Sequence, residues 1–238
     1  MLGILGGMGP LATADFLTKV VRNTDASSDQ DHIPIIVRCV PQVPDRTLAL
    51  AGQGPSPLPA LTLGLQALVS AGASVIAIPC NTAHAWYDEL QERASIPIVH
   101  IAEATAEALA CRVARGARIG ILATRGTLAT GIYSSRLGAA GYEPLVPSDA
   151  DQDSLVTPAI ALVKSGNIVD ARRLLRRAIW RLRERGTEGV VLACTEIPVA
   201  LTGSHLTLDP DLLDATEALA RACVDRFSPP SRRARSRG

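Results

Sequence analysis

The chain has 238 residues, 47% of them hydrophobic, which is enough to bury one large core or two small ones and excludes a disordered protein. Aromatic residues make up only 3% of the chain, which argues against stacking surfaces for single-stranded nucleic acid. The formal net charge of +1 carries no signature of a nucleic-acid or membrane partner, so we expect the partner to be a small molecule.

The five cysteines form an odd set without the CxxC spacing of a zinc site, and a chain of this length does not need disulfides to fold. We therefore expect free thiols, no metal and a reducing compartment. No basic leader precedes the first apolar residues, and no run approaches the roughly 18 to 20 apolar residues of a membrane span. These features predict a cytoplasmic protein.

The first half of the chain alternates predicted strands with predicted helices, which is the pattern of a parallel sheet. Its first strand, Leu2–Leu5, is followed by the glycine-rich turn Gly6–Pro10 and by a helix that runs to about Val21. The glycines lack GxGxxG spacing, so we expect the turn to bring backbone N–H groups close to a small anion rather than to bind a nucleotide. Further strands are expected at 33–40, 75–78 and 96–101, and further helices at 61–71, 83–93 and 102–115.

The second half begins by repeating the first. Gly120–Thr130 has the same pattern as Gly3–Thr13, 117 residues downstream, and Cys194 follows Cys80 by a similar interval of 114 residues, which indicates a duplicated βα unit. A helix rich in arginine is expected at 168–185. Its arginines are expected to form a face exposed to solvent, and the alternative is that they bind an anion or contact another subunit. The other elements expected here are a strand at 142–146, a helix at 149–164, a short strand at 206–208, a closing helix at 210–227 and a disordered basic tail at 228–238.

These elements predict an α/β fold of two pseudo-symmetric half-domains, each a short, mostly parallel sheet flanked by helices, with the active site in the cleft between them. We assign residues 1–101 and about 207–227 to the first half-domain and residues 102–206 to the second. Each half then contributes one cysteine at the end of a strand.

Cys80 and Cys194 each end an apolar run and are followed within two residues by a threonine. A thiol in this setting lies at the carboxyl edge of a sheet and at the start of a helix, where open α/β folds bind ligands. The helix dipole contributes about 0.3 to 2 kcal/mol and lowers the thiol pKa by well under two units, so a further group must favour the thiolate. His84, one helical turn beyond Cys80, is one candidate, although a residue of the helix face is the simpler interpretation.

Two thiols on opposite walls of one cleft can racemise an amino acid, since one thiolate removes the α-proton from one face and the other thiol returns a proton to the opposite face. Without a pyridoxal cofactor, hydrogen bonds must stabilise the enediolate-like carbanion, and Asn81, Thr82 and Thr195 stand beside the cysteines for that purpose. Arg46 lies near the end of the rigid segment 41–47 and is suited to clamp a substrate carboxylate, with a surface salt bridge as the alternative.

Four segments of the chain resemble the cofactor-independent aspartate/glutamate racemase superfamily, and aspartate racemases most closely. They are Gly3–Thr13, Pro41–Thr47, Ala77–His84 and Ala193–Glu196, and the resemblance extends from Leu2 to about Phe227. It implies a homodimer without cofactor or metal. It also implies a two-base reaction in which the first cysteine serves the D-face of the substrate and the second serves the L-face.

The resemblance further implies roles for single residues. Arg46 and Lys164 are expected to receive the β-carboxylate of aspartate, and Glu196, where glutamate racemases tend to carry histidine, favours aspartate over glutamate. The expected catalytic residues are Cys80 and Cys194. The expected substrate-binding residues are Met8, Arg46, Asn81, Thr82, Thr124, Lys164, Thr195 and Glu196.

Val40 and Arg125 depart from the family pattern, which leaves other substrates open. The alternatives among enzymes are a glutamate racemase, a racemase of broader specificity, and a diacid isomerase or decarboxylase of the same superfamily. The alternative outside the enzymes is a module that binds a small anion.

Overall fold

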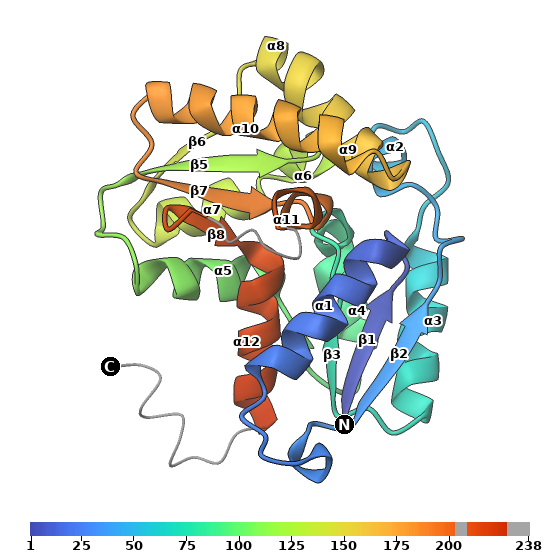
Figure 1. Cartoon of the computed structure of the whole chain (residues 1–238). Helices are drawn as coiled ribbons and strands as arrows, with labels where there is room; N and C mark the ends of the chain where they lie inside the picture. Colours follow the sequence, from blue (N-terminus) through green and yellow to red (C-terminus); the bar gives the residue numbers. More distant parts are fainter. Residues whose placement is uncertain (203–208, 228–238) are drawn as a thin grey trace.

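The computed structural model describes residues 1–202 and 209–227, which form two four-stranded parallel sheets with helices on both sides (Figure 1). The strands of the first sheet are β1 (Leu2–Gly6), β2 (Ile35–Cys39), β3 (Val75–Ala77) and β4 (Ile98–Val99). The strands of the second sheet are β5 (Arg118–Ala123), β6 (Glu143–Leu145), β7 (Gly189–Ala193) and β8 (Leu212–Asp214). The strand orders are β2-β1-β3-β4 and β6-β5-β7-β8.

Helices connect the strands. The first half contains α1 (Pro10–Asn23), α2 (Arg46–Leu50), α3 (Leu58–Ser70), α4 (Tyr87–Arg93) and the 3-10 segments η1 (Asp29–Asp31) and η2 (Thr82–Trp86). After α5 (Ile101–Ala110), the second half contains α6 (Arg125–Thr130), α7 (Ile132–Ala139), α8 (Asp149–Asp151), the π-helical η3 (Gln152–Val156), α9 (Thr157–Lys164), α10 (Ile168–Glu184), α11 (Glu196–Leu201) and α12 (Ala215–Phe227). Within residues 1–202 and 209–227, no helix is both long enough and apolar enough to span a bilayer.

The two sheets repeat one arrangement. In the first sheet β1 pairs with β2 on one side and β3 on the other, and in the second sheet β5 pairs in the same way with β6 and β7. The third strand of each half, β3 or β7, leads to one of the two cysteines, Cys80 or Cys194. The predicted α/β fold of two similar halves is therefore confirmed.

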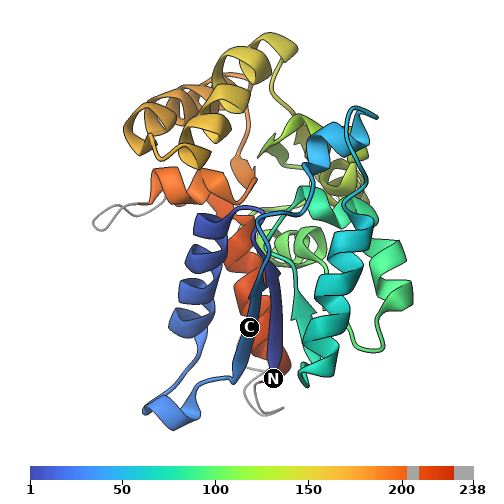
Figure 2. The ribbon, with the colours of Figure 1, turned by 90° about the vertical axis from the view of Figure 1, so that its right-hand side faces the viewer.

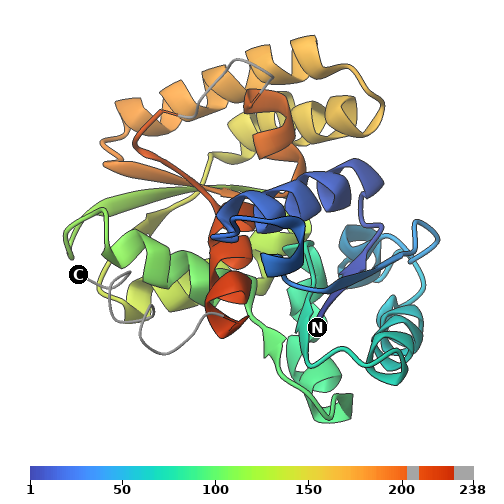
Figure 3. The same cartoon turned by 60° about the horizontal axis from the view of Figure 1, so that its bottom comes forward.

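Three buried apolar layers hold the sheets and helices together. Leu5 and Leu65 belong to the layer between the first sheet and α3, and Leu122 and Leu175 belong to the layer between the second sheet and α10. The middle layer, which includes Phe16 of α1, joins the inner faces of both sheets to α1, α5, α7 and α12. Figure 2 shows α1 and α3 on opposite sides of the first sheet, and Figure 3 shows the second sheet between α10 and α5. Because the middle layer is shared, the two halves pack as one body.

The strands of the two sheets point toward one region of the molecule. In Figure 1 the arrowheads of β1, β5 and β7 converge on the place where α2, α6 and α11 lie. The helix α2 of the first half packs there against α6 of the second half. Ligands of open α/β sheets bind beyond the carboxyl ends of the strands, so the fold brings two such edges to one site.

The division of the chain differs from the prediction near its C-terminal end. We assigned residues from about 207 to 227 to the first half-domain, but β8 pairs with β7 and belongs to the second sheet. Its residues are buried, so pairing satisfies backbone groups that water cannot reach. The closing helix predicted at 210–227 therefore begins only at Ala215, and α12 packs against both α1 and α5. The strand predicted at 206–208 and the tail predicted at 228–238 lie outside the described residues.

The helix predicted at 149–164 is present without a break, but its hydrogen-bond pattern changes from α8 through the π-helical turn η3 to α9. Pro158 in this segment has no N–H to donate, so a regular hydrogen-bond ladder cannot run through it. The side chain of Gln152 donates to the carbonyl oxygen of Ala123 at 3.1 Å and so anchors η3 to the end of β5. The helix predicted at 83–93 likewise begins as the 3-10 segment η2.

Candidate active site

One pocket lies where the carboxyl edges of the two sheets meet, and it encloses about 320 Å³ of space between atoms, counting its open mouth. All ten predicted site residues line it, namely Met8, Arg46, Cys80, Asn81, Thr82, Thr124, Lys164, Cys194, Thr195 and Glu196. Asp45 and Thr47, which were not predicted, line it as well. Residues of both halves therefore surround one space.

Cys80 follows β3 and is only 5% exposed. The backbone N–H of Ala83, in η2, and the guanidinium of Arg46 both lie within hydrogen-bonding reach of its thiol. Burial raises the pKa of the Cys80 thiol above its ordinary value, whereas Arg46 and the Ala83 N–H lower it because they stabilise the thiolate. Cys80 is thus a buried thiol whose ionised form has two donors nearby.

His84 holds the backbone of the turn that carries Cys80. Its Nδ1 lies 2.9 Å from the carbonyl oxygen of Cys80, and the backbone N–H of Ile101 donates to its Nε2 at 3.2 Å. Because Nε2 accepts, Nδ1 carries the proton and donates it to the carbonyl. Burial lowers the pKa of His84 to about 4, so the ring is neutral near pH 7. His84 therefore brings no positive charge to the thiol, and the alternative in which it assists Cys80 as a base does not fit this geometry.

Cys194 follows β7 and is 4% exposed. Its thiol donates a hydrogen bond of 3.1 Å to Oε2 of Glu196, and the hydroxyl of Thr195 donates to the same oxygen at 3.2 Å. Burial and the adjacent Glu196 carboxylate raise the pKa of Cys194 well above its ordinary value, whereas the Glu196 backbone N–H and the charge of Lys164 act in the opposite direction. The two cysteines occupy equivalent places in the fold but face different charges.

Arg46 is the first residue of α2, and its guanidinium is fixed by the backbone. Its Nη1 donates to the carbonyl oxygens of Val43 and Pro44 at 3.1 Å and 3.0 Å. Its Nη2 donates to the carbonyl oxygen of Met8 at 3.5 Å, and its buried Nε has no hydrogen-bond partner within the described residues. The salt bridge given as an alternative for Arg46 is not formed within those residues. Lys164, the last residue of α9, supplies the second positive charge from the other half.

Two sets of polar contacts join the halves beside the cysteines. Tyr133 of α7 donates a hydrogen bond to the side-chain oxygen of Asn81, whose buried Nδ2 has no partner among the described residues. The hydroxyl of Thr82 lies 3.0 Å from that of Thr124 and 2.9 Å from that of Thr127. These contacts fix the turn after Cys80 of the first half against α6 and α7 of the second.

Close packing beside the pocket requires glycine at two positions. Gly7 has φ of +99°, and a Cβ there would lie 2.3 Å from the backbone nitrogen of Val40. A Cβ on Gly126 would lie 2.8 Å from the hydroxyl of Thr47, so this glycine lets α2 approach α6. The N–H of Gly7 donates to the Thr13 hydroxyl at 2.9 Å, so the turn uses this donor internally and does not offer it to an anion.

Sequence reasoning missed four residues that line or support the pocket: Asp45, Thr47, Thr127 and Tyr133. Asp45 and Thr127 carry a local signal, since Asp45 caps α2 and Thr127 donates its N–H to the cap residue three positions earlier. No local pattern connects Tyr133 with Asn81, 52 residues away. Within residues 1–202 and 209–227, no group of three or more His, Cys, Asp or Glu side chains is arranged to hold a metal ion.

Comparison with curated proteins finds amino acid racemases. The broad specificity amino-acid racemase RacX of Bacillus subtilis (strain 168) is 29% identical over 233 residues, which span 95% of this chain and 98% of RacX. A glutamate racemase of Desulforudis audaxviator (strain MP104C) is 31% identical over 160 residues, which span 65% of this chain and 56% of that protein.

Comparison with solved structures and with protein families agrees. The aspartate racemase of Picrophilus torridus superposes with a TM-score of 0.82 at 30% identity, over 95% of this chain and 93% of that one. An aspartate racemase homologue of Pyrococcus horikoshii OT3 superposes with a TM-score of 0.73 at 25% identity, over 96% of this chain and 99% of that one. The family model described as Asp/Glu/hydantoin racemase matches residues 5–223. With its duplicated fold and its pocket between the halves, the chain thus belongs to the Asp/Glu/hydantoin racemase family.

Proposed function

We propose that the protein interconverts L- and D-aspartate by a two-base reaction that uses Cys80 and Cys194 and no cofactor. The observation that carries this proposal is the composition of the pocket, in which one cysteine and one cation from each half, Arg46 and Lys164 being the cations, line the same space. The similarity to the Picrophilus torridus aspartate racemase over 95% of the chain supports the same substrate.

The proposed substrate contacts follow from the polar groups that line the pocket. Arg46 and Lys164 receive the β-carboxylate of the substrate. An amino acid with a second carboxylate needs cations for that group in addition to the donors that bind its α-carboxylate. The buried Nδ2 of Asn81 donates to the α-carboxylate, together with the hydroxyl of Thr82. The carboxylate of Asp45 is an acceptor for the α-ammonium group.

In the proposed reaction the thiolate of one cysteine removes the α-proton, so that the S–H bond forms as the Cα–H bond breaks. The electron pair left on Cα spreads into the α-carboxylate, and the donors around that group stabilise the enediolate-like charge. The thiol of the other cysteine then gives its proton to the opposite face of Cα and becomes the thiolate. The product is the other enantiomer, and no atom other than hydrogen is exchanged.

The test is incubation of L-aspartate with the purified protein in deuterium oxide, followed by chiral chromatography and mass spectrometry. The expected result is D-aspartate carrying deuterium at Cα. Loss of carbon dioxide would instead identify the decarboxylase alternative, and unchanged, undeuterated L-aspartate would refute the proposal.

Two variants and one control make this test specific to the cysteines. Cys80→Ala and Cys194→Ala should each reduce racemisation by at least about 10³-fold, since each removes one of two obligatory proton carriers. Cys111→Ala, which changes an exposed cysteine, should leave the rate unchanged. Full activity in either pocket variant would exclude a two-base reaction.

A racemase of broader specificity is the second candidate, favoured by the end-to-end similarity to RacX. A panel of acidic, basic and small neutral amino acids, including glutamate, separates the two. An aspartate racemase requires Arg46 and Lys164, so neutral and basic amino acids should be converted at least about 100-fold more slowly than aspartate. Comparable rates across the panel would support broad specificity.

We also propose that the protein is a homodimer in the cytoplasm. Its five cysteines are free, two of them exposed, which suits a reducing compartment. Light scattering coupled to size-exclusion chromatography tests the dimer, and cell fractionation tests the location.

A further inference from the structure

Glu196 is a buried carboxylate whose hydrogen-bond donors are a thiol and a hydroxyl. It is 5% exposed, and it forms no ion pair within the described residues. Its Oε2 accepts from the thiol of Cys194 at 3.1 Å and from the hydroxyl of Thr195 at 3.2 Å. A buried charge needs such partners, because it has lost the water that would otherwise stabilise it. The S–H of Cys194 is therefore one of two side-chain donors to this buried carboxylate.

Ionisation of Cys194 would place a thiolate 3.1 Å from the Glu196 carboxylate and remove the hydrogen bond between them. Like charges at this distance disfavour ionisation of the second group. Cys80 has the opposite surroundings, since the groups within reach of its thiol are the Arg46 guanidinium and the Ala83 N–H, which are both donors. A negative charge in the pocket is thus more stable on Cys80 than on Cys194.

We infer that Glu196 is a positioning residue that keeps Cys194 in its protonated form, so that Cys80 ionises first and is the base of the resting enzyme while Cys194 is the acid. This inference rests on the proposed two-base function and adds an order to it. It also assigns Glu196, which we expected only to bind substrate, a role on the thiol beside it.

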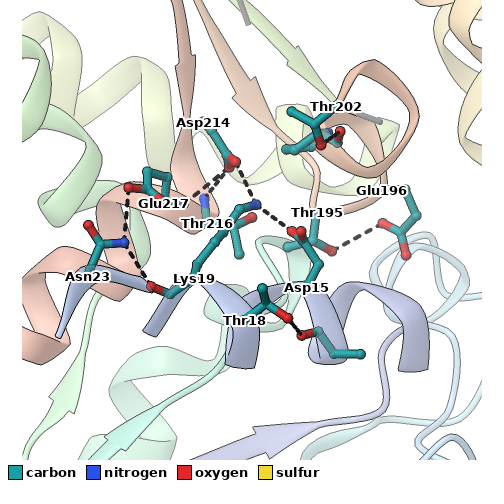
Figure 4. A network of polar contacts seen from close by, with 12 residues as sticks. Asp15, Thr18, Lys19, Asn23, Thr195, Glu196, Thr202, Asp214, Thr216 and Glu217 are labelled. Carbon is teal, nitrogen blue, oxygen red and sulfur yellow. Dashed lines mark hydrogen bonds and ion pairs between the residues drawn. The ribbon is translucent and has the colours of Figure 1, made fainter. Parts of the chain in front are cut away.

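The other charged groups around the two thiols leave this order unchanged. Lys164 of α9 faces Cys194 but is exposed, so water screens its charge. The α1 helix packs against α11, and Figure 4 shows Lys19 of α1 between Asp15 and Asp214, while Thr195 contacts Glu196. The Lys19 ammonium is already paired with two carboxylates and is not available to Glu196.

Further groups act on the thiols more weakly. The buried phenol of Tyr133 also faces Cys194, and its raised pKa keeps it neutral. The Glu196 charge reaches Cys80 as well, but there it follows burial, Arg46 and the Ala83 N–H in strength. Arg46 therefore outweighs Glu196 at Cys80, and no group around Cys194 outweighs Glu196 there.

The order predicts how the proton balance changes in one turnover. The Cys80 thiolate takes the α-proton as the Cα–H bond breaks, and the Cys194 S–H bond breaks as its proton passes to the opposite face of Cα. The enzyme then holds a Cys194 thiolate beside Glu196, which is the less stable arrangement. It returns to rest when Cys194 takes a proton and Cys80 gives one to water.

Alkylation of the free enzyme tests the order without any substrate. The full-length protein is exposed to short pulses of iodoacetamide between pH 6 and pH 11, and mass spectrometry measures the labelling of each cysteine. Burial slows the labelling of a thiol, so the midpoint of each pH profile, rather than the absolute rate, is taken as the measure of ionisation. Cys80 and Cys194 are buried to nearly the same extent, so their two midpoints can be compared directly. The exposed Cys39 and Cys111 lie outside the pocket lining of the same molecule and serve as internal references.

In the wild-type protein the midpoint of Cys80 should lie below that of Cys194. Glu196→Gln keeps the side-chain shape but removes the charge. The alkylation midpoint of Cys194 should therefore fall by about 1 to 3 pH units, while the midpoints of Cys39 and Cys111 stay fixed. Glu143→Gln, which changes an exposed carboxylate on β6, should move none of them. A Cys194 midpoint at or below that of Cys80, or one that Glu196→Gln leaves in place, would overturn the inference.

Activity gives a second, independent measurement. With D-aspartate, the enantiomer that Cys80 is expected to deprotonate, the alkaline limb of the pH profile of kcat/KM reports loss of the Cys194 proton, so it should move to lower pH in Glu196→Gln. If the protein proved not to racemise aspartate, this profile could not be recorded, but the alkylation midpoints would still decide the order of ionisation. If Glu196→Gln failed to fold, the order of the two midpoints in the wild-type protein would still confirm or refute the inference.

Discussion

The hydroxyl of Tyr133, on α7 of the second half, donates a hydrogen bond to the side-chain oxygen of Asn81, the residue after Cys80 in the first half. This bond leaves the buried Nδ2 of Asn81 without a partner in the described residues. A residue outside the pocket lining thus determines which end of the Asn81 amide remains free to bind a ligand.

Tyr133→Phe is expected to lower both activity and stability. The variant leaves the Asn81 oxygen unpaired, which should cost about 1 to 3 kcal/mol of the free energy of unfolding, and it lets the amide turn away from the α-carboxylate. The kcat/KM for aspartate should fall about tenfold or more. Tyr142→Phe is the matched control, because that hydroxyl donates to the carbonyl oxygen of Val113 away from the pocket. Steady-state kinetics and urea unfolding measure the two effects, and an unchanged kcat/KM would contradict the role of Tyr133.

Arg46→Lys is expected to weaken binding of aspartate. Lysine keeps the charge but lacks the planar fork, so it cannot hold the Val43 and Pro44 carbonyls with one nitrogen while another faces the substrate. We expect KM for aspartate to rise about 10- to 100-fold with a smaller change in kcat. Arg176→Lys, on the exposed face of α10, is the control and should change neither constant. Equal KM values for the wild-type protein and Arg46→Lys would exclude the proposed clamp.

Acid should destabilise the protein through two buried histidines. Burial lowers the pKa of His84 to about 4 and that of His100 to about 2, whereas both titrate near 6.5 in the unfolded chain. The unfolded chain therefore binds more protons below about pH 6.5, and each histidine should remove about 2 kcal/mol of the free energy of unfolding between pH 7.5 and pH 5.

Substitution isolates this effect from the titration of carboxylates. His100→Asn keeps an acceptor at the start of α5, where Nδ1 of His100 now accepts from the N–H of Ala102 at 3.1 Å. Between pH 7.5 and pH 5 the free energy of unfolding, measured with urea, should fall by about 2 kcal/mol less in this variant than in the wild-type protein. A pH dependence that is the same in His100→Asn and in the wild-type protein would be evidence against a neutral, buried His100.

Lys19→Met should strongly destabilise the fold. Lys19 of α1 pairs with Asp15 and, at 2.6 Å, with Asp214 of β8, so it connects the two halves of the chain (Figure 4). Burial raises the pKa of Asp15, and Lys19 opposes this shift. Removal of the ammonium leaves two partly or fully buried carboxylates unpaired, which should cost about 3 to 5 kcal/mol of the free energy of unfolding. Arg22→Met, on the exposed side of α1, is the control, and a loss under about 1 kcal/mol in Lys19→Met would show that the network is not stabilising.

Several parts of the site could be predicted from local sequence alone. Cys80 and Cys194 each end an apolar run, and strands in α/β proteins deliver such residues to the carboxyl edge of a sheet. The repeat of Gly3–Thr13 at Gly120–Thr130 indicated that two such edges would exist. Arg46 was suggested by the rigid segment that carries it, whereas Lys164 came only from the resemblance to a family.

Other parts were decided only by tertiary structure. The strand β8 pairs with β7 and so belongs to the second sheet, and no local pattern of residues indicated this pairing. His84 became a neutral support of the Cys80 backbone because the surrounding core excludes water.

By itself the sequence determined which residues stand at the ends of strands, since strand formation and helix starts depend on neighbours a few positions apart. Only the tertiary structure decided which charges face each thiol, because Arg46 and Glu196 reach Cys80 and Cys194 across turns whose course depends on packing. Electrostatic interactions depend on distance in space and on burial, and neither can be read from positions along the chain.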